Sequence, residues 1–310
     1  MVLSQRAKNL RPFHVMDILA QAKALSLQGK TIYHMEVGEP DFATAECIVN
    51  AGIDALKQFK THYTPALGLP ELRHAVAEYY DRKFSVNIDP ERIIITPGAS
   101  GALQLAMLCL LDAGENVLLR DLGYPCNRNI AQVLSAQTIA IPVSEENAYQ
   151  LDAASIAKYW NDKTRVAMVA TPSNPTGTIL SENKLKEICQ IVAQNKGSLI
   201  VDEIYQGLVY DVADYTALAT SNECFVINSF SKYFGMTGWR IGWMVVPEFY
   251  IDAIDRIAQN IFLAPPTISQ YAALTALKAE TQIELDARRD VVKQRRDFLL
   301  PAWEQIGFKI

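Results

Sequence analysis

Residues 228–243 combine a lysine, two serines and an arginine in a spacing that suits a phosphate site with an amine inside it. The stretch reads Asn-Ser-Phe-Ser-Lys-Tyr-Phe-Gly-Met-Thr-Gly-Trp-Arg-Ile-Gly-Trp, so that Lys232 follows Ser229 and Ser231 and precedes Arg240. Arginine presents a planar set of donors to phosphate oxygens, and serine hydroxyls donate further hydrogen bonds. A lysine in partly apolar surroundings loses its proton more readily and attacks aldehydes.

Pyridoxal 5'-phosphate (PLP) is a cofactor that carries both an aldehyde and a phosphate. The stretch resembles the Schiff-base motif Ser-x-Ser-Lys…Gly-x-Arg-x-Gly of the class I/II, fold-type I, PLP-dependent aminotransferases. The resemblance extends over nearly the whole chain. It implies that Lys232 forms the Schiff base with PLP, and that Ser229, Ser231 and Arg240 hold its phosphate. A loop with a solvated lysine and an ion-paired arginine is the alternative for this stretch alone.

A second candidate phosphate contact is the glycine loop at residues 96–101, Thr-Pro-Gly-Ala-Ser-Gly. It lies between an expected strand and an apolar helix, where backbone amides at the helix N-terminus can receive a phosphate. The loop resembles the family's glycine loop, which implies cofactor contacts from Gly98, Ala99 and Ser100. A small-residue turn is the alternative.

Two further motifs imply contacts with the cofactor ring. Tyr124 follows an expected strand, and in the family an aromatic side chain here stacks on the pyridine ring. Residues 171–177, Thr-Pro-Ser-Asn-Pro-Thr-Gly, contain Asn-Pro-Thr-Gly after a buried strand. This is the more specific motif, and it implies that the Asn174 amide donates to the phenolic oxygen of the cofactor.

Residues 201–205, Val-Asp-Glu-Ile-Tyr, end a hydrophobic strand. By resemblance, the carboxylate of Asp202 keeps the pyridine nitrogen protonated, which makes the ring an electron sink. Tyr205 shares the phenolic oxygen with Asn174. An acidic pair at a helix start is the alternative for Asp202 and Glu203.

The resemblance also implies contacts for Gly38 and Tyr63. Gly38, in Val-Gly-Glu-Pro-Asp-Phe, matches a glycine whose backbone meets the substrate carboxylate, and a plain turn is the alternative. Tyr63 matches a tyrosine that reaches the phosphate of the neighbouring subunit, which implies a homodimer with shared sites. A tyrosine packed at a loop end is the alternative.

Alternating strands and helices predict a scaffold of the α/β class, with a mostly parallel seven-stranded sheet between helices. The functional motifs fall at the carboxyl ends of the strands, where open α/β sheets bind ligands. The family runs the last strand antiparallel to the others. Strands are expected at residues 93–96, 116–120, 137–141, 166–170, 198–201, 225–228 and 240–246, with a short separate strand at 31–37. Helices are expected near residues 12–29, 45–59, 70–84, 99–111, 127–134, 153–160, 181–195, 247–258 and 283–306, after an irregular arm at residues 1–12.

Composition excludes several classes of protein. The net charge of −5 is mild and evenly spread, which makes nucleic acid and lipid surfaces improbable partners. The five cysteines form no Cys-x-x-Cys pair, so we expect neither a metal site nor a disulfide framework, and free thiols suit the cytoplasm. No stretch reaches the roughly 20 apolar residues of a membrane span, and we expect no signal peptide.

The domain prediction has three parts. Residues 1–44 are an N-terminal arm and small-domain segment, residues 45–280 the large PLP-binding domain, and residues 281–310 the start of a C-terminal small domain. Residues 307–310 are expected to begin a strand. In the family, a further stretch completes the small domain and carries an arginine that binds the substrate carboxylate. We therefore expect a truncated copy of the family chain that binds amino acids poorly, unless Arg11 or Arg256 supplies this contact.

The resemblance implies a PLP-dependent aminotransferase with Lys232, Asp202 and Tyr205 as catalytic residues. Its substrates are an L-amino acid and a 2-oxo acid, and its kinetics are ping-pong. Two alternatives remain. One is a fold-type I lyase of the cysteine-S-conjugate β-lyase type, and the other is a non-catalytic PLP-binding module, as in regulators that fuse this fold to a DNA-binding domain.

Overall fold

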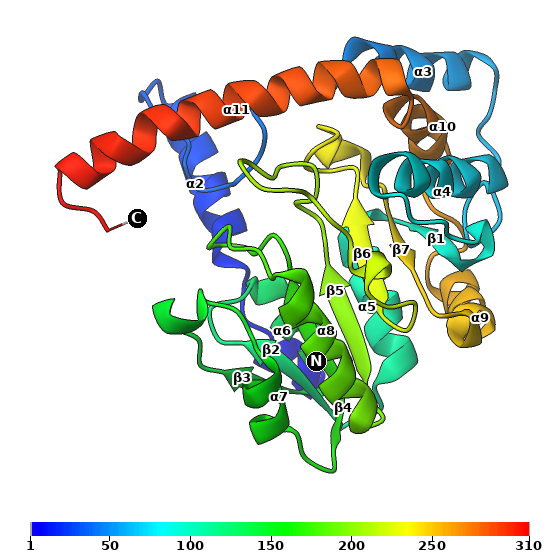
Figure 1. Cartoon of the computed structure of the whole chain (residues 1–310). Helices are drawn as coiled ribbons and strands as arrows, with labels where there is room; N and C mark the ends of the chain where they lie inside the picture. Colours follow the sequence, from blue (N-terminus) through cyan, green and yellow to red (C-terminus); the bar gives the residue numbers. More distant parts are fainter. Residues whose placement is uncertain (1, 310) are drawn as a thin grey trace. The chain divides into compact units, whose positions relative to one another are not determined.

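The computed structural model describes residues 2–309 and has one seven-stranded sheet in the order β1-β7-β6-β5-β4-β2-β3 (Figure 1). The seven strands expected for the sheet are confirmed, with bounds that differ by at most two residues. Their bounds are β1 (Ile93–Thr96), β2 (Asn116–Arg120), β3 (Gln137–Ile141), β4 (Thr164–Ala170), β5 (Ser198–Asp202), β6 (Phe225–Ser229) and β7 (Gly242–Val245). β2 is buried throughout and β3, at the sheet edge, is partly exposed, as expected for inner and edge strands.

The expected helices are also present, and α1 and α10 form in addition. The bounds are α1 (Gln5–Asn9), α2 (His14–Leu27), α3 (Glu46–Lys57), α4 (Pro70–Phe84), α5 (Gly98–Leu110), α6 (Pro125–Val133), α7 (Ala153–Tyr159), α8 (Glu182–Gln194), α9 (Ile251–Ile261), α10 (Thr267–Ala276) and α11 (Ala279–Gln305). Several begin with recognisable caps: the Asp152 side chain accepts from the Ser155 amide, and Pro70 is the first residue of α4.

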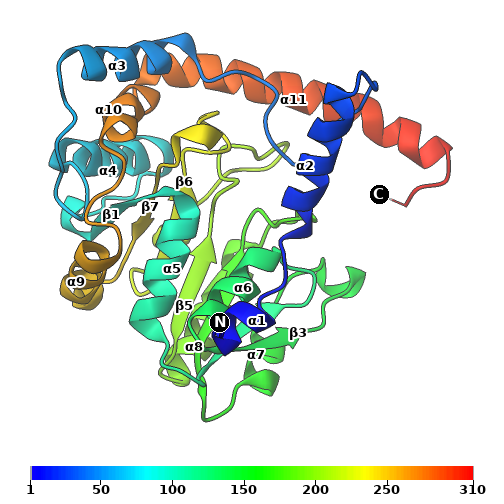
Figure 2. The same ribbon diagram turned by 180° about the vertical axis from the view of Figure 1, so that it is seen from behind.

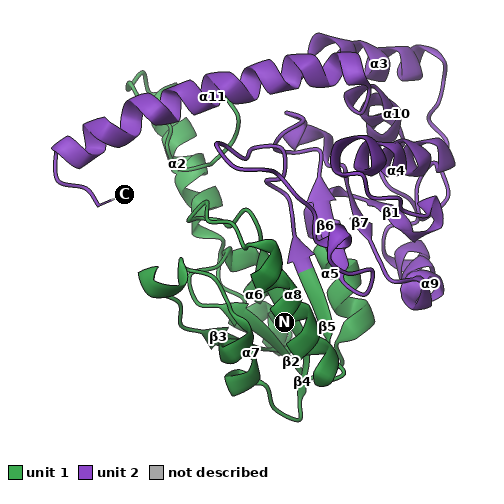
Figure 3. Ribbon diagram, viewed as in Figure 1, with its two compact units in different colours: residues 1–41, 103–200 green, residues 42–102, 201–310 purple. Residues whose placement is uncertain are grey.

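The chain divides into two compact units (Figure 3). Unit 1 contains residues 1–41 and 103–200, and unit 2 contains residues 42–102 and 201–310. The predicted domain boundaries after residues 44 and 280 stay a prediction. Within unit 1, α7 and α8 lie in front of the strands in Figure 1, whereas α1 and α6 lie in front in the reverse view of Figure 2. Helices therefore cover both faces of this part of the sheet.

Unit 2 is built around β1, β6 and β7, with an aromatic core beside them. Tyr79 and Tyr80 of α4 are buried with Phe230, Phe234 and Trp243. The Trp243 indole nitrogen donates to the Tyr80 hydroxyl at 3.2 Å, so both of these polar groups have a partner inside the core. Phe230, Phe234 and Trp243 belong to the Lys232 stretch, so the segment that joins β6 to β7 is itself anchored in this core.

Three sequence expectations are wrong. Residues 31–37 form no strand, and neither do residues 307–309. Both segments have the alternation or composition of a strand, but a strand needs a hydrogen-bonding neighbour, and all strands of residues 2–309 pair with one another in the single sheet. Residue 310, the end of the second expected strand, lies outside the described residues. The N-terminal arm is not wholly irregular, because α1 forms there with the Ser4 hydroxyl accepting from the Ala7 amide.

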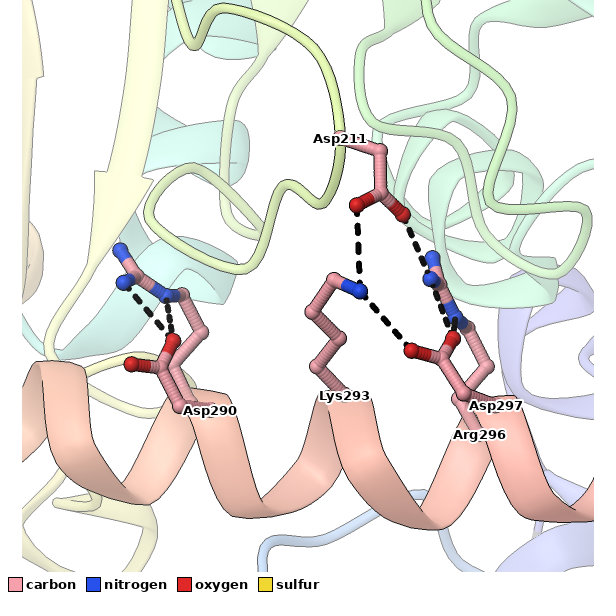
Figure 4. Close-up of polar contacts among 6 residues, drawn as sticks. Asp211, Asp290, Lys293, Arg296 and Asp297 are labelled. Carbon is pink, nitrogen blue, oxygen red and sulfur yellow. Dashed lines mark hydrogen bonds and ion pairs between the residues drawn. The ribbon is translucent and has the colours of Figure 1, made fainter.

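A charged network holds α11 against the loop that follows Tyr205 (Figure 4). Asp211 contacts Lys293 Nζ at 3.1 Å and Arg296 Nη2 at 2.7 Å, and both cations also contact Asp297. The hydrogen bonds from Arg296 and Lys293 lower the pKa of Asp211. Exposed pairs of this kind are individually weak, so their effect here is to orient the loop and helix within unit 2.

Two searches of residues 2–309 complete the description. No helix in this range is long and apolar enough to cross a membrane. In the same residues, no group of three or more His, Cys, Asp or Glu side chains is arranged to hold a metal ion. None of the five cysteines, all of which lie within residues 2–309, forms a disulfide.

Candidate active site

The pairing of β1, β7 and β6 brings the phosphate-binding candidates of unit 2 together at the carboxyl ends of β1 and β6. Thr96, the last residue of β1, and Ser229, the last residue of β6, both lie opposite Gly242, the first residue of β7. β1 and β6 both run antiparallel to β7, so they run in the same direction and end at the same level. The loops after residues 96 and 229 therefore leave the sheet side by side, with the start of β7 between them.

Gly98 and Arg240 meet at the N-terminus of α5. Gly98 has a φ of +70°, and a Cβ there would lie 2.6 Å from Arg240 Nη2. A Cβ on Gly242 would lie 2.9 Å from the Ala99 amide nitrogen, so the start of β7 also packs against this turn. Only glycine allows such approaches, which explains why the family motif has glycine here. The guanidinium thus lies beside the first amides of the helix, where the helix dipole favours an anion.

The two serines of the Lys232 stretch face each other. Ser229 Oγ donates to Ser231 Oγ at 3.0 Å, and the Ser231 amide donates to Ser229 Oγ at 3.0 Å. Both serines are buried, and Lys232 is half-buried with its Nζ 5.7 Å from the centroid of the Tyr205 ring. The structure therefore brings the expected amine beside the expected tyrosine.

Asp202 is the last residue of β5 and is buried, with its Oδ1 accepting from the Ile204 amide at 3.1 Å. The alternative that Asp202 and Glu203 start a helix is wrong, because a turn follows β5. Glu203 is fully buried instead; this burial raises its pKa, while the hydrogen bonds from the Ala217 amide and the Thr216 hydroxyl oppose the rise. The two carboxyls therefore have different surroundings although they are adjacent in the chain.

The remaining ring candidates belong to unit 1. Tyr124 is the N-cap residue of α6, and its ring contacts Phe13 edge to face at 5.6 Å between centroids. Asn174 lies in the loop after β4, and its carbonyl accepts from Arg120 Nη2 at 2.5 Å. Gly38 lies in an exposed segment, where an added Cβ would meet no atom within 4 Å. These three positions stay predictions for ring and substrate contacts.

Tyr63, the candidate for a contact across a dimer, is 83% exposed. It lies in the loop between α3 and α4, which is anchored by Gln270: its Oε1 accepts from the Leu69 amide at 2.7 Å and its Nε2 donates to Thr64 Oγ1 at 2.9 Å. The alternative of a tyrosine packed at a loop end is wrong for this chain by itself, because the side chain is largely uncovered.

The residues of unit 2 fit the groups of PLP. A guanidinium, two hydroxyls and the first amides of a long helix suit a phosphate dianion, and the close approach of Arg240 to Gly98 shows that the guanidinium is placed at that helix end. Lys232 supplies an amine, and Asp202 supplies a buried carboxylate for a ring nitrogen.

Replacing Gly98 by alanine should weaken PLP binding about tenfold, or ~1.4 kcal/mol. The new Cβ would lie 2.6 Å from Arg240 Nη2 at a φ of +70°, so the guanidinium must move and the backbone is strained. Fluorescence titration of the apoprotein with PLP measures the effect. Gly238→Ala is the control, since a Cβ there meets no atom within 4 Å. Equal affinities for Gly98→Ala and the wild type would contradict this site.

Sequence reasoning missed Arg120, which is buried at the end of β2. Its guanidinium donates to the Ser173 hydroxyl and to the Asn174 carbonyl, and so holds the loop that carries Asn174. A charged residue ending an otherwise apolar strand, Asn-Val-Leu-Leu-Arg, was the available signal. Its partner lies 53 residues away in the chain, which no local pattern reveals.

Comparison with known proteins agrees with this geometry. Residues 30–310 match the family described as "Aminotransferase class I and II". The chain is 38% identical to a (5-formylfuran-3-yl)methyl phosphate transaminase of Methanocaldococcus jannaschii, over 100% of this chain and 81% of that protein. It is also 38% identical to a valine–pyruvate aminotransferase of Mycobacterium tuberculosis, over 96% of this chain and 76% of that protein.

Solved structures show the same fold. A crystal structure of an aminotransferase from Mycobacterium tuberculosis matches with a TM-score of 0.95 and 36% identity, covering 99% of this chain and 79% of that one. Aspartate aminotransferase from Thermus thermophilus with maleate matches with a TM-score of 0.95 and 29% identity, covering 100% of this chain and 82% of that one.

Proposed function

The chain belongs to the class I and II aminotransferases, which depend on PLP and transfer amino groups by a ping-pong mechanism, and on this premise we propose how its own residues divide the work. One observation carries the proposal. At the carboxyl ends of β1 and β6, Gly98 and Arg240 lie close together, and Ser229 and Ser231 lie beside Lys232. This is a phosphate cradle with an amine next to it.

The cradle residues bind the phosphate of the cofactor. Arg240 and the hydroxyl of Ser231 donate hydrogen bonds to its oxygens, with the amides of residues 98–100 at the start of α5. Ser229 Oγ donates to Ser231 Oγ and so leaves the Ser231 hydrogen for the phosphate. These donors fix the cofactor at its non-reacting end. Lys232, which follows Ser231 directly, is thereby held at a set distance from the anchored phosphate.

Lys232 and Asp202 then carry the chemistry. When bound, PLP supplies a carbonyl carbon for the amino group and a ring that accepts the electrons of the breaking Cα–H bond. The amine of Lys232 would bind the carbonyl carbon of the cofactor and, when free, would accept the Cα proton of the substrate at Nζ. Asp202 keeps a proton on the pyridine nitrogen. Tyr205 and Asn174 donate to the phenolic oxygen, and Tyr124 stacks on the ring.

The residues that bind the substrate are different from those that bind the cofactor phosphate. Gly38 and Asn174 are the proposed substrate contacts, with the Gly38 backbone at the carboxylate. Arg11 and Arg256 are the candidates for a charged contact within residues 2–309. The two relatives at 38% identity are named for a furan phosphate and for valine with pyruvate, so identity alone does not select a substrate.

The test is a panel of amino donors offered with 2-oxoglutarate or pyruvate. We expect parallel double-reciprocal lines, the sign of ping-pong transfer, with at least one donor. Release of pyruvate and ammonia from a thioether amino acid without any 2-oxo acid would instead indicate the lyase alternative. The transaminase names of the relatives favour transfer.

We also propose a cytoplasmic homodimer in which Tyr63 reaches the partner's phosphate. The exposure of Tyr63 in the isolated chain supports this, because a largely uncovered tyrosine is available to a second copy. The free thiols support a reducing compartment.

Hybrid dimers of Lys232→Ala and Tyr63→Phe chains should regain about half of the wild-type activity, because a two-fold dimer then has one site with both defects and one with neither. The two chains carry different affinity tags, so that hybrids are purified apart from both parents, and a tagged wild-type dimer is the control. If each chain used its own Tyr63, the hybrid would show only half of the activity of the Tyr63→Phe dimer.

A further inference from the structure

Glu203 is a fully buried carboxyl that the proposed chemistry does not use. Its Oε1 accepts from the Ala217 amide at 2.6 Å, and its Oε2 accepts from Thr216 Oγ1 at 2.9 Å. Oε2 also accepts from Gln206 Nε2 at 3.0 Å. All of these neighbours donate, so the carboxyl is an acceptor at every contact.

From Glu203 a line of buried hydrogen bonds runs to the cradle. Gln206 Oε1 accepts from Asn228 Nδ2 at 2.8 Å. Asn228 Oδ1 accepts from the Ser229 amide at 2.8 Å, and Ser229 Oγ donates to Ser231 Oγ at 3.0 Å. Gln206, Asn228, Ser229 and Ser231 are all buried, so water does not compete for these bonds.

The direction of each bond depends on the one before it. A side-chain amide has a donor end and an acceptor end. Because Gln206 turns its NH₂ to Glu203, its oxygen faces Asn228; because Asn228 turns its NH₂ to that oxygen, its own oxygen faces the Ser229 amide. A second acceptor, the Tyr215 carbonyl, receives Gln206 Nε2 at 3.2 Å and favours the same orientation.

Reversing the orientation of one of these buried amides costs free energy of folding. A buried donor that faces another donor loses its hydrogen bond without regaining one to water, at about 1–3 kcal/mol. Reversing one amide would therefore disturb the next link rather than be absorbed by solvent.

We propose that Glu203 is a positioning residue for the cofactor: as the acceptor that starts the Glu203–Gln206–Asn228 relay, it sets the orientation of both amides and so holds the Ser229–Ser231 turn in the shape that binds phosphate. The inference rests on the proposed phosphate role of Ser229 and Ser231. Glu203 itself touches neither the cofactor nor the substrate.

Glu203→Gln tests the relay by placing an NH₂ where Gln206 Nε2 needs an acceptor. We expect the Kd of the apoprotein for PLP to rise about tenfold, and the ³¹P resonance of bound PLP to shift. Adding Gln206→Glu restores a donor–acceptor pair and keeps an acceptor toward Asn228, although it turns an oxygen toward the Tyr215 carbonyl that accepts from Gln206 Nε2. The double variant should therefore recover part of the loss, with a Kd about threefold lower than that of Glu203→Gln.

Asn228→Asp disrupts the relay at a second point, because it sets an acceptor against Gln206 Oε1. This variant replaces Glu203→Gln in the test if Glu203→Gln does not fold. Leu185→Ala, a truncation in the buried face of α8, is the control for general loss of stability: it should lower the unfolding temperature and leave the Kd and the ³¹P resonance unchanged.

The outcomes distinguish failure of the relay from failure of the proposed phosphate site. Wild-type Kd in Glu203→Gln or in Asn228→Asp would overturn the relay if Ser231→Ala raises the Kd. No rescue in the double variant would overturn the directional relay. Wild-type Kd in Ser231→Ala would overturn the proposed cradle and the relay with it.

Discussion

Lys232→Ala should lower kcat/KM for transamination about 10,000-fold or more. The variant loses both the amine that holds the cofactor carbon and the base that moves the Cα proton, and a positioned base alone contributes up to about 10,000-fold. Stopped assays at high enzyme concentration measure the residual rate. Added methylamine should recover a small part of it, since a free amine can replace the missing base but not its position.

Covalent labelling checks the same assignment without an activity assay. Borohydride treatment of the wild-type protein with PLP should attach the cofactor to the peptide that contains Lys232. The phosphate cradle is intact in Lys232→Ala, so this variant should still bind PLP but should not become labelled. Lys184→Ala, at an exposed position on α8, is the matched control and should label normally. A labelled peptide without Lys232 would overturn the assignment.

Asp202→Asn should lower kcat about 100- to 1,000-fold or more while PLP remains bound. A neutral amide cannot hold a proton on the pyridine nitrogen as a carboxylate does, so the ring becomes a poorer electron acceptor. The side chain keeps its size, and the hydrogen bond from the Ile204 amide to Oδ1 can remain. The loss should therefore fall on kcat rather than on PLP affinity.

Asp202→Glu is the companion variant, because it keeps the charge and changes only its reach. It should retain more activity than Asp202→Asn if the charge matters, and less if only the shape of the site matters. Near-normal turnover in Asp202→Asn would make Asp202 a structural residue. The PLP titration, run beside the assay, separates loss of chemistry from loss of cofactor.

Local patterns in the chain were enough to predict most of the scaffold. Ile93–Thr96 and Asn116–Arg120 are short apolar runs between turn residues, and their strands have the predicted bounds. The helix expected at residues 181–195 likewise forms, as α8, and it buries Leu185, Ile188 and Val192 at helical spacing. These elements are determined locally, because the period of apolar residues decides which backbone conformation can bury them.

The sequence by itself also determined the chemical groups of the cradle. The Lys232 stretch and the glycine loop carry the family motif, and motif residues must keep their type wherever the fold places them. What the motif could not supply was the register that sets Thr96 and Ser229 on either side of Gly242, since pairing joins residues far apart in the chain.

Only the tertiary structure decided the roles of residues without a local signal. Residues 31–37 alternate like a strand, yet within residues 2–309 no strand pairs with them, so the pattern alone could not make one. Glu203 reads as half of an acidic pair, but burial and the distant Thr216, Ala217 and Asn228 turn it into the start of a directed hydrogen-bond relay. Burial and partner direction arise from long-range packing, and for that reason neither is written in the local sequence.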